Sequence, residues 1–246
     1  MKIVEIEHAK FDLSRPVDIS IPLSFGKSVT AFGVGQPQRT HFEAGGFVGD
    51  VSKGGSCNCD QITLIPHCQT THTECVSHIL HDGPYIHETI APYFGLAELV
   101  SVDSNGVTKD KLSKVVRSKN ISALIIRSLP NADTKKSFQY QGHSNFMSVD
   151  AIEFCNDLGV EHLLVDFPSI DPMEDGGKLL AHRTFWNVPS GTNSKQSDIW
   201  FHKSVTELVY VSNEVPDGVY LLNLQVAAME LDAAPARPIL YPKVVI

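Results

Sequence analysis

The chain has 246 residues, 42% of them apolar, so it is long enough to bury a sizeable core without disulfides. Its 28 acidic and 20 basic residues give a formal charge of −8, and no cluster of lysines or arginines offers a surface for nucleic acid. No apolar run approaches the roughly 20 residues that cross a bilayer, and none of the cysteines forms a CxxC pair. We therefore expect a cytoplasmic protein without a nucleic-acid or membrane partner.

The first quarter of the chain predicts strands followed by a long loop. Apolar alternation indicates strands at residues 2–6 and 17–23, joined by a turn around Arg15 and Pro16. Residues 30–56 are rich in glycine and phenylalanine, and we expect them to form a long ordered loop. Phe32, Phe42 and Phe47 favour a role for this loop as a lid or pocket wall.

The remainder of the chain predicts buried strands alternating with helices. Short apolar runs at residues 97–102, 123–127 and 163–165 are typical of strands buried on both faces. Residues 148–158 have helical spacing, with Ser148 as N-cap and Gly159 as the stop. Residues 175–186 suggest a second helix, and residues 205–211 and 219–226 suggest strands separated by a turn. Because there is no repeat or linker, we expect a single α/β domain over residues 1–246.

Residues 67–80, HCQTTHTECVSHIL, concentrate three histidines, a glutamate and two cysteines. The histidine spacing does not fit an HExxH zinc helix. The threonines favour an extended strand, on which His72, Glu74 and His78 share one face. Because imidazole and carboxylate groups together are common ligands of zinc, manganese or iron, this face predicts a metal site.

The first ligand of this site has two candidates. Cys68 shares the face of His72, whereas His67 has the opposite parity and joins the site only if a bulge or turn intervenes. Cys75 points away from both His72 and His78 on such a strand, which disfavours a nucleophilic cysteine with a histidine base.

The segment THTECVSH resembles the second half of H-x-G-T-H-x-D-x-P-x-H, the signature of the cyclase family of metal-dependent hydrolases, which includes bacterial kynurenine formamidases and isatin hydrolases. Glu74 and Val76 stand where the signature has aspartate and proline, and Cys68 stands where it has its first histidine. Other segments that resemble the family are FDLSRPVDISIPL, VDFPSID, LLAHRTFW, SVTELVYV and DAAPARPILY. The resemblance implies a swivelling β/β/α fold, an α/β architecture with a mixed sheet and flanking helices.

The resemblance also implies a ligand set for one or two divalent ions, with zinc preferred over manganese. The implied ligands are His67 (with Cys68 as the alternative), His72, Glu74, His182 and Glu207. If two ions bind, Glu74 is the natural bridge between them. His78 is implied to be the general acid and base, with a further metal ligand as the alternative. The segment 187–203, between the last two ligands, looks like an insertion.

The implied activity is hydrolysis of a small amide by a metal-activated water, most like an arylformamidase that converts N-formylkynurenine to kynurenine and formate. Hydrolysis of a cyclic amide or lactone, a non-catalytic metal or small-ligand binding protein, and a redox-sensing cysteine protein are the alternatives. Candidate substrate contacts are Phe32, Phe47, Trp186 and Arg237; the alternatives are core packing for the aromatic residues and a surface ion pair for the arginine. The family resemblance also implies a homodimer or a higher homo-oligomer.

Overall fold

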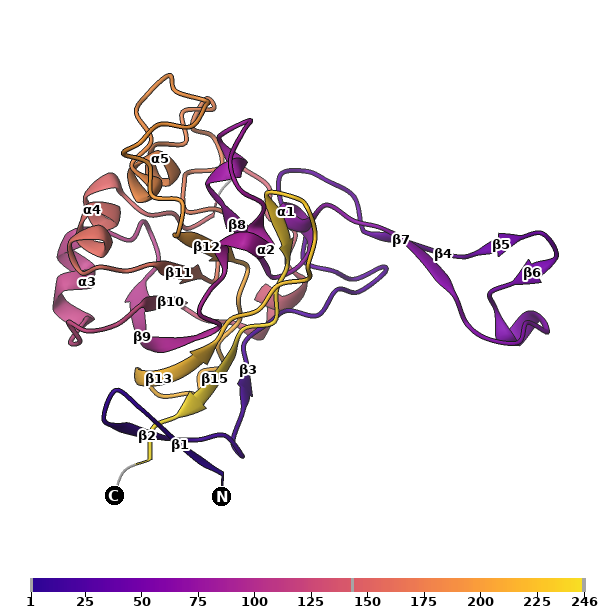
Figure 1. Ribbon diagram of the computed structural model, residues 1–246, viewed down its shortest axis with the longest axis horizontal. Coiled ribbons are helices and arrows are strands. Elements are labelled where there is room, and N and C mark those ends of the chain that lie inside the picture. The colour runs from indigo at the N-terminus through magenta and orange to yellow at the C-terminus, as the bar shows by residue number, and fades with distance from the viewer. Residues whose placement is uncertain (1, 143, 245–246) are drawn as a thin grey trace.

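The computed structural model describes residues 2–142 and 144–244, and its framework is a nine-stranded mixed sheet (Figure 1). The strand order is β14-β8-β12-β11-β10-β9-β13-β15-β3. The central strands β9 to β12 run parallel, and the strands outside them pair antiparallel. The strands of this sheet are β3 (Val17–Asp18), β8 (His72–Cys75), β9 (Phe94–Asp103), β10 (Ala123–Leu129), β11 (His162–Val165), β12 (Ser204–Glu207), β13 (Gly218–Asn223), β14 (Ala233–Pro235) and β15 (Ile239–Pro242).

Both faces of the central strands are buried, which explains their continuous apolar runs. On β10, Leu124 and Ile126 pack into one apolar cluster and Ile125 into another, because successive side chains point to opposite faces. The first cluster contains side chains of α3, α4 and α5, which lie along one side of the sheet in Figure 1, and the second contains a side chain of α2. The helices are α1 (Pro66–Gln69), α2 (Ile86–Thr89), α3 (Lys109–Val115), α4 (Val149–Asp157) and α5 (Leu180–Trp186), with short 3-10 turns η1 (Val51–Lys53), η2 (Val76–His78) and η3 (Asp133–Ser137).

The architecture agrees with the expected α/β fold, a mixed sheet with flanking helices. The predicted strands at 97–102, 123–127 and 163–165 are present as β9, β10 and β11, and the predicted helix at 148–158 is present as α4. Over the two described ranges, no helix is long and apolar enough to span a membrane.

The N-terminal strands pair differently from the prediction. β1 (Ile3–Ile6) forms a hairpin with β2 (Ala9–Asp12), and β3 pairs with β15. Glu7 and His8 both have positive φ angles, 47° and 64°, so the chain reverses immediately after β1. The prediction that residues 2–6 pair with residues 17–23 is therefore wrong.

Most of the glycine-rich run forms a projecting arm, which we define as residues 38–63. β4 (Gln38–His41) pairs with β7 (Asp60–Thr63), and β5 (Glu43–Ala44) pairs with β6 (Phe47–Val48). Gly45 and Gly46 take the positive φ angles, 57° and 86°, that the turn between β5 and β6 requires. Figure 1 shows the arm extending away from the sheet. The prediction of a long ordered loop is wrong, because these residues form two antiparallel strand pairs.

Several element ends also differ from prediction, and two of the differences have a local backbone cause. The helix expected from residue 175 begins only at Leu180, because the Asp175 carboxylate accepts the backbone N–H groups of Gly177 and Leu179 in a turn. β12 ends at Glu207 because Leu208 has a φ of 56°, so the expected strand over residues 205–211 is shorter. β13 likewise ends at Asn223 instead of reaching residue 226.

Candidate metal centre and its pocket

The histidine-rich stretch is a helix, a strand and a turn in succession. Pro66 occupies the first turn of α1, which carries His67 and Cys68; β8 follows, and η2 ends at His78. The prediction of one continuous strand is therefore wrong. His72 and Glu74 do share a face of β8 as expected. The helical turn of α1 is what carries His67 toward the same place.

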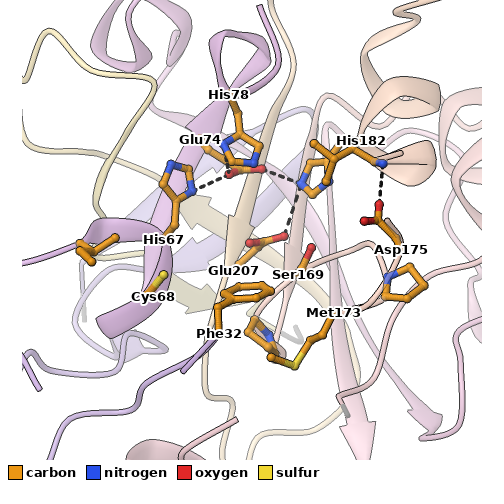
Figure 2. A pocket seen from close by; sticks show the side chains of 14 residues that line it. Phe32, His67, Cys68, Glu74, His78, Ser169, Met173, Asp175, His182 and Glu207 are labelled. Carbon is orange, nitrogen blue, oxygen red and sulfur yellow. Dashed lines mark hydrogen bonds and ion pairs between the residues drawn. The ribbon is translucent and has the colours of Figure 1, made fainter. Parts of the chain in front are cut away.

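Two side chains from other elements meet the β8 face. Glu207 on β12 lies opposite His72 in the antiparallel register, with Glu207 Oε2 3.4 Å from His72 Nε2. His182 on α5 places its Nε2 atom 2.7 Å from Glu74 Oε1 and 3.5 Å from Glu207 Oε1 (Figure 2). These four side chains, all buried, thus converge from three elements that are distant in sequence.

His67 and His78 approach the same carboxylate from the more exposed side. His67 Nδ1 lies 2.9 Å from Glu74 Oε2, and His78 Nδ1 lies 3.8 Å from the same oxygen. Asp232, from the loop before β14, places Oδ2 2.9 Å from His67 Nε2 and 3.3 Å from His78 Nδ1. Cys68 lines the pocket, but in the described part of the chain it belongs to none of the groups of histidine, cysteine and acidic residues close enough to share a metal ion.

The imidazoles next to Glu74 and Glu207 are oriented by partners behind them. One nitrogen of each faces a carboxylate, and the other nitrogen is held by a fixed oxygen. These oxygens are the Thr70 carbonyl for His72 (3.0 Å), Asp171 Oδ2 for His182 (2.7 Å) and Asp232 Oδ2 for His67 (2.9 Å). Metal-ligating histidines have this arrangement in proteins, because the second hydrogen bond fixes the tautomer and the ring orientation.

Three buried polar atoms at the centre lie beside ion-pair partners but lack hydrogen-bond geometry. Among the described residues, His72 Nε2, Glu74 Oε1 and His182 Nε2 have no hydrogen-bond partner. Leaving such atoms without hydrogen bonds in the interior is costly. One cation held by His67, His72 and Glu74 and another held by Glu74, His182 and Glu207 would satisfy all three. The donor set, imidazole nitrogen and carboxylate oxygen, fits a divalent zinc-type or manganese-type ion.

The electrostatics of the cluster favour a cation. Burial alone raises the pKa of Glu74, but the imidazoles of His78 and His182 outweigh it and hold that pKa well below its usual value. Burial lowers the pKa of His67, but the carboxylates of Asp232 and Glu74 outweigh it and raise that pKa to about 10. Nearby carboxylates likewise outweigh burial and raise the pKa of His182 well above its usual value. Protons on His67 and His182 therefore balance the carboxylates, and a metal ion that takes their place must displace them. We expect metal affinity to fall as the pH falls.

The cluster lies in a pocket of about 360 Å³. The apolar part of its lining consists of Phe32, Ile65, Pro168, Pro172, Met173 and Leu179. Ser169 and Asp175 add polar groups (Figure 2). No lysine or arginine is among the described residues that line the pocket. The pocket therefore combines an acidic, histidine-rich side with an apolar side.

Of the predicted substrate contacts, only Phe32 lines this pocket. Phe47 lies on β6 in the arm, outside the pocket. Trp186 is fully buried in the core, where its Nε1–H donates to the Lys203 carbonyl oxygen. Arg237 forms an exposed ion pair with Asp18 at 2.8 Å. Trp186 therefore packs in the core and Arg237 forms a surface ion pair, and neither lines the pocket.

Sequence reasoning assigned no role to Asp171 or Asp232. Both lie inside segments that resemble the cyclase family, VDFPSID and DAAPARPILY. Asp171 accepts hydrogen bonds from the backbone N–H groups of Ala181 and His182 as well as contacting the His182 ring. It therefore fixes the first turn of α5 and the imidazole together.

Known proteins resemble the chain in sequence and in fold. Residues 11–172 match a family model described as "Putative cyclase". A kynurenine formamidase of Bacillus cytotoxicus is 26% identical over 192 residues, which cover 77% of this chain and 83% of that protein. The fold resembles a solved structure of a potential metal-dependent hydrolase with cyclase activity, with a TM-score of 0.67 at 17% identity over 92% of this chain and 97% of the other. It also resembles an isatin hydrolase bound to the product analogue thioisatinate, with a TM-score of 0.65 at 12% identity over 93% and 92%.

Proposed function

Because the chain belongs to the cyclase family, we propose that it is a metal-dependent hydrolase of small amides, most like an arylformamidase. The observation that carries the proposal is the buried cluster of His72, Glu74 and His182 beside a pocket. Their Nε2, Oε1 and Nε2 atoms have no hydrogen-bond partner in the part of the chain that the structure describes. The kynurenine formamidase relative and the hydrolases among the structural neighbours support it.

The proposed ligands are His67, His72, Glu74, His182 and Glu207. The two oxygens of Glu74 face different imidazoles, Oε1 toward His182 and Oε2 toward His67, which suits a carboxylate that bridges two ions. Zinc is the preferred ion and manganese the second, because the donors are nitrogen and oxygen. When bound, a divalent cation makes water more acidic and polarises a carbonyl group.

His78 is the proposed general base and acid. Its Nδ1 atom is held by Asp232 at 3.3 Å, which leaves Nε2 available for proton transfer. With the ring proton on Nδ1 and donated to Asp232, Nε2 takes a proton from the attacking water. It returns that proton to the amine nitrogen as the amide bond breaks. His78 lines the pocket and is partly exposed, so a substrate in the pocket lies within reach of its ring.

The pocket suits a small aromatic amide. Phe32 and Met173 provide an apolar wall for a ring, and about 360 Å³ is the size of a site for a small ligand. N-formylkynurenine carries a carboxylate, for which the described lining offers no lysine or arginine partner. This observation favours a second candidate, hydrolysis of an uncharged cyclic amide or lactone by the same residues.

The test is a hydrolysis assay on the metal-free protein and on the protein reloaded with a known metal ion. The protein is freed of metal with a chelator, reloaded with Zn²⁺ or Mn²⁺, and assayed on N-formylkynurenine, formanilide and isatin. We expect metal-dependent turnover, which falls by about 10²–10⁴ in His78→Gln. His81→Gln is the matched control, since His81 is exposed and lies three residues further along the chain. Stoichiometric metal without turnover on any substrate would refute the enzyme proposal and leave a binding protein.

We also propose that the chain forms a homodimer or a higher homo-oligomer. Phe42, Val51 and Ile62 are all exposed apolar residues of the projecting arm, and apolar side chains on an extension of this kind suit contact with a partner. Light scattering on the native chain and on Phe42→Ser tests this: we expect an oligomer that dissociates in the variant. A monomeric native chain would refute it.

A further inference from the structure

A second set of donor atoms lies outside the buried cluster. His67, His78 and Asp232 have side chains that are 22%, 27% and 35% exposed, and each offers one ligand atom within 4.8 Å of the others. Asp232 Oδ2 lies 2.9 Å from His67 Nε2 and 3.3 Å from His78 Nδ1. Ligand atoms around a tetrahedral zinc ion lie about 3.3 Å apart when the bonds are about 2.0–2.1 Å, so this spacing needs only small adjustments.

We propose that His67, His78 and Asp232 form an outer site for a divalent transition-metal ion, and that an ion bound there inhibits the enzyme. The binding part of the proposal stands on these three residues alone. The inhibition rests on the proposed function, because it requires His78 to be the acid and base.

The outer site exists because of where His67 lies on α1. Successive residues of a helix are rotated by about 100°, so His67 points in a different direction from Cys68, the position that corresponds to the first histidine of the family signature. Cys68 lines the pocket but belongs to none of the possible ligand groups found over residues 2–142 and 144–244. His67, one position earlier, reaches both Glu74 and Asp232.

The two nitrogens of His67 make the inner and outer positions alternatives. Nδ1 faces Glu74 Oε2 and Nε2 faces Asp232 Oδ2, each at 2.9 Å. With a proton on Nε2, the ring donates to Asp232 and offers Nδ1 to an inner ion. With a proton on Nδ1, the ring donates to Glu74 and offers Nε2 to an outer ion. A neutral imidazole has one lone pair in the ring plane, so it serves one position at a time.

The charges around the outer position also suit a cation. In the described ranges, the ion-pair partners of Asp232 are His67 and His78, without a lysine or arginine. The Glu74 carboxylate lies 3.8 Å from His78 Nδ1 and adds a second negative charge nearby. A divalent ion at the outer position would therefore lie near the carboxylates of Asp232 and Glu74.

An ion at the outer position removes His78 from catalysis. Coordination through Nδ1 leaves the proton of the neutral ring on Nε2, and that nitrogen then has no lone pair with which to accept a proton from water. It also withdraws His67 from the inner position. Activity should therefore rise with metal concentration while the inner position fills, and fall again when the outer position fills.

The binding test uses Co²⁺ alone as the probe. The metal-free full chain is titrated with Co²⁺ at neutral pH, with visible absorption and calorimetry as readouts. We expect a tight phase and a second phase, weaker by at least tenfold. The weaker phase should disappear in Asp232→Asn and persist in the matched control Asp110→Asn, an exposed acid that pairs with Lys114 on α3. A single phase in the native chain, or an unchanged weaker phase in Asp232→Asn, would overturn the outer site.

The activity test separates this proposal from the proposed function. Formanilide hydrolysis is followed over a Zn²⁺ series, and each protein's activity is expressed relative to its own maximum because Asp232 also holds His78. We expect at least a tenfold fall at high Zn²⁺ that shifts to at least tenfold higher Zn²⁺ in Asp232→Asn. Absence of turnover at every Zn²⁺ concentration refutes the proposed function, while the Co²⁺ titration still decides the outer site. If circular dichroism shows that Asp232→Asn does not fold, His78→Ala replaces it in the Co²⁺ titration, and the weaker phase should disappear in that variant. High-Zn²⁺ inhibition that is unchanged in a folded Asp232→Asn overturns the inhibition.

Discussion

His67→Ala and Cys68→Ser, made separately, decide which residue supplies the first proposed metal ligand. His67 Nδ1 lies 2.9 Å from Glu74 Oε2, whereas Cys68 belongs to none of the possible ligand groups in the described residues. Burial, assisted by the Glu207 charge, raises the pKa of the Cys68 thiol to about 11. Forming the thiolate ligand at pH 7 therefore costs on the order of 5 kcal/mol, since each pKa unit corresponds to about 1.36 kcal/mol.

The magnitude follows from the number of ligands. Four-ligand zinc sites have apparent binding free energies of about 10–16 kcal/mol, so one ligand contributes on the order of 3 kcal/mol, or a factor of about 150 in affinity. We expect His67→Ala to lose about that factor, and Cys68→Ser to change affinity by less than about threefold. Competition with a chromophoric chelator measures both. A Cys68→Ser variant that loses affinity as strongly as His67→Ala would refute the assignment.

Three further predictions concern Asp171, His162 and Phe32. Asp171→Asn should weaken metal affinity by about 10–100-fold, because His182 loses its orienting carboxylate at 2.7 Å; unchanged affinity by chelator competition would contradict this. Burial, with a smaller effect from His202, lowers the pKa of His162 to about 4, so the unfolded chain binds more protons as the pH falls from 6.5 toward 4, and stability is lost in that window. Relative to His162→Gln, the native chain should lose about 2.5 kcal/mol of unfolding free energy between pH 7.5 and about pH 4.5, measured by urea titration; parallel pH profiles would exclude the effect. Phe32→Ala should raise KM for formanilide by about 5–20-fold with little change in kcat, and an unaltered KM would show that this ring is not a substrate contact.

The sheet at the centre of the fold could be predicted because its signal is local. Residues 123–126, the first four of β10, are all apolar, and a strand of that kind needs both faces covered, as β10 has. The shared face of His72 and Glu74 likewise follows from strand periodicity alone. The strand prediction extended too far toward His67 and His78, because the helix at Pro66–Gln69 and the turn at Val76–His78 leave only four residues extended.

Strand periodicity could not predict which distant residues contact the predicted site residues. His67 meets Asp232 across 165 positions, and neither residue lies in a periodic segment whose pairing the pattern predicts. Phe32 reaches the pocket and Trp186 enters the core, although both are aromatic residues with similar expected roles. Composition does not distinguish them, because the distinction depends on where α5 packs against the sheet.

The sequence by itself determined the residue types of the centre, the strands that carry it and the resemblance to a family, because backbone periodicity and short motifs are properties of neighbouring residues. Only the tertiary structure decided that His67 and not Cys68 faces Glu74, that Asp171 and Asp232 hold the imidazoles, and that Phe32 alone of four candidates lines the pocket. Those contacts join segments far apart in the chain, and the packing of helices and loops on the sheet sets their distances.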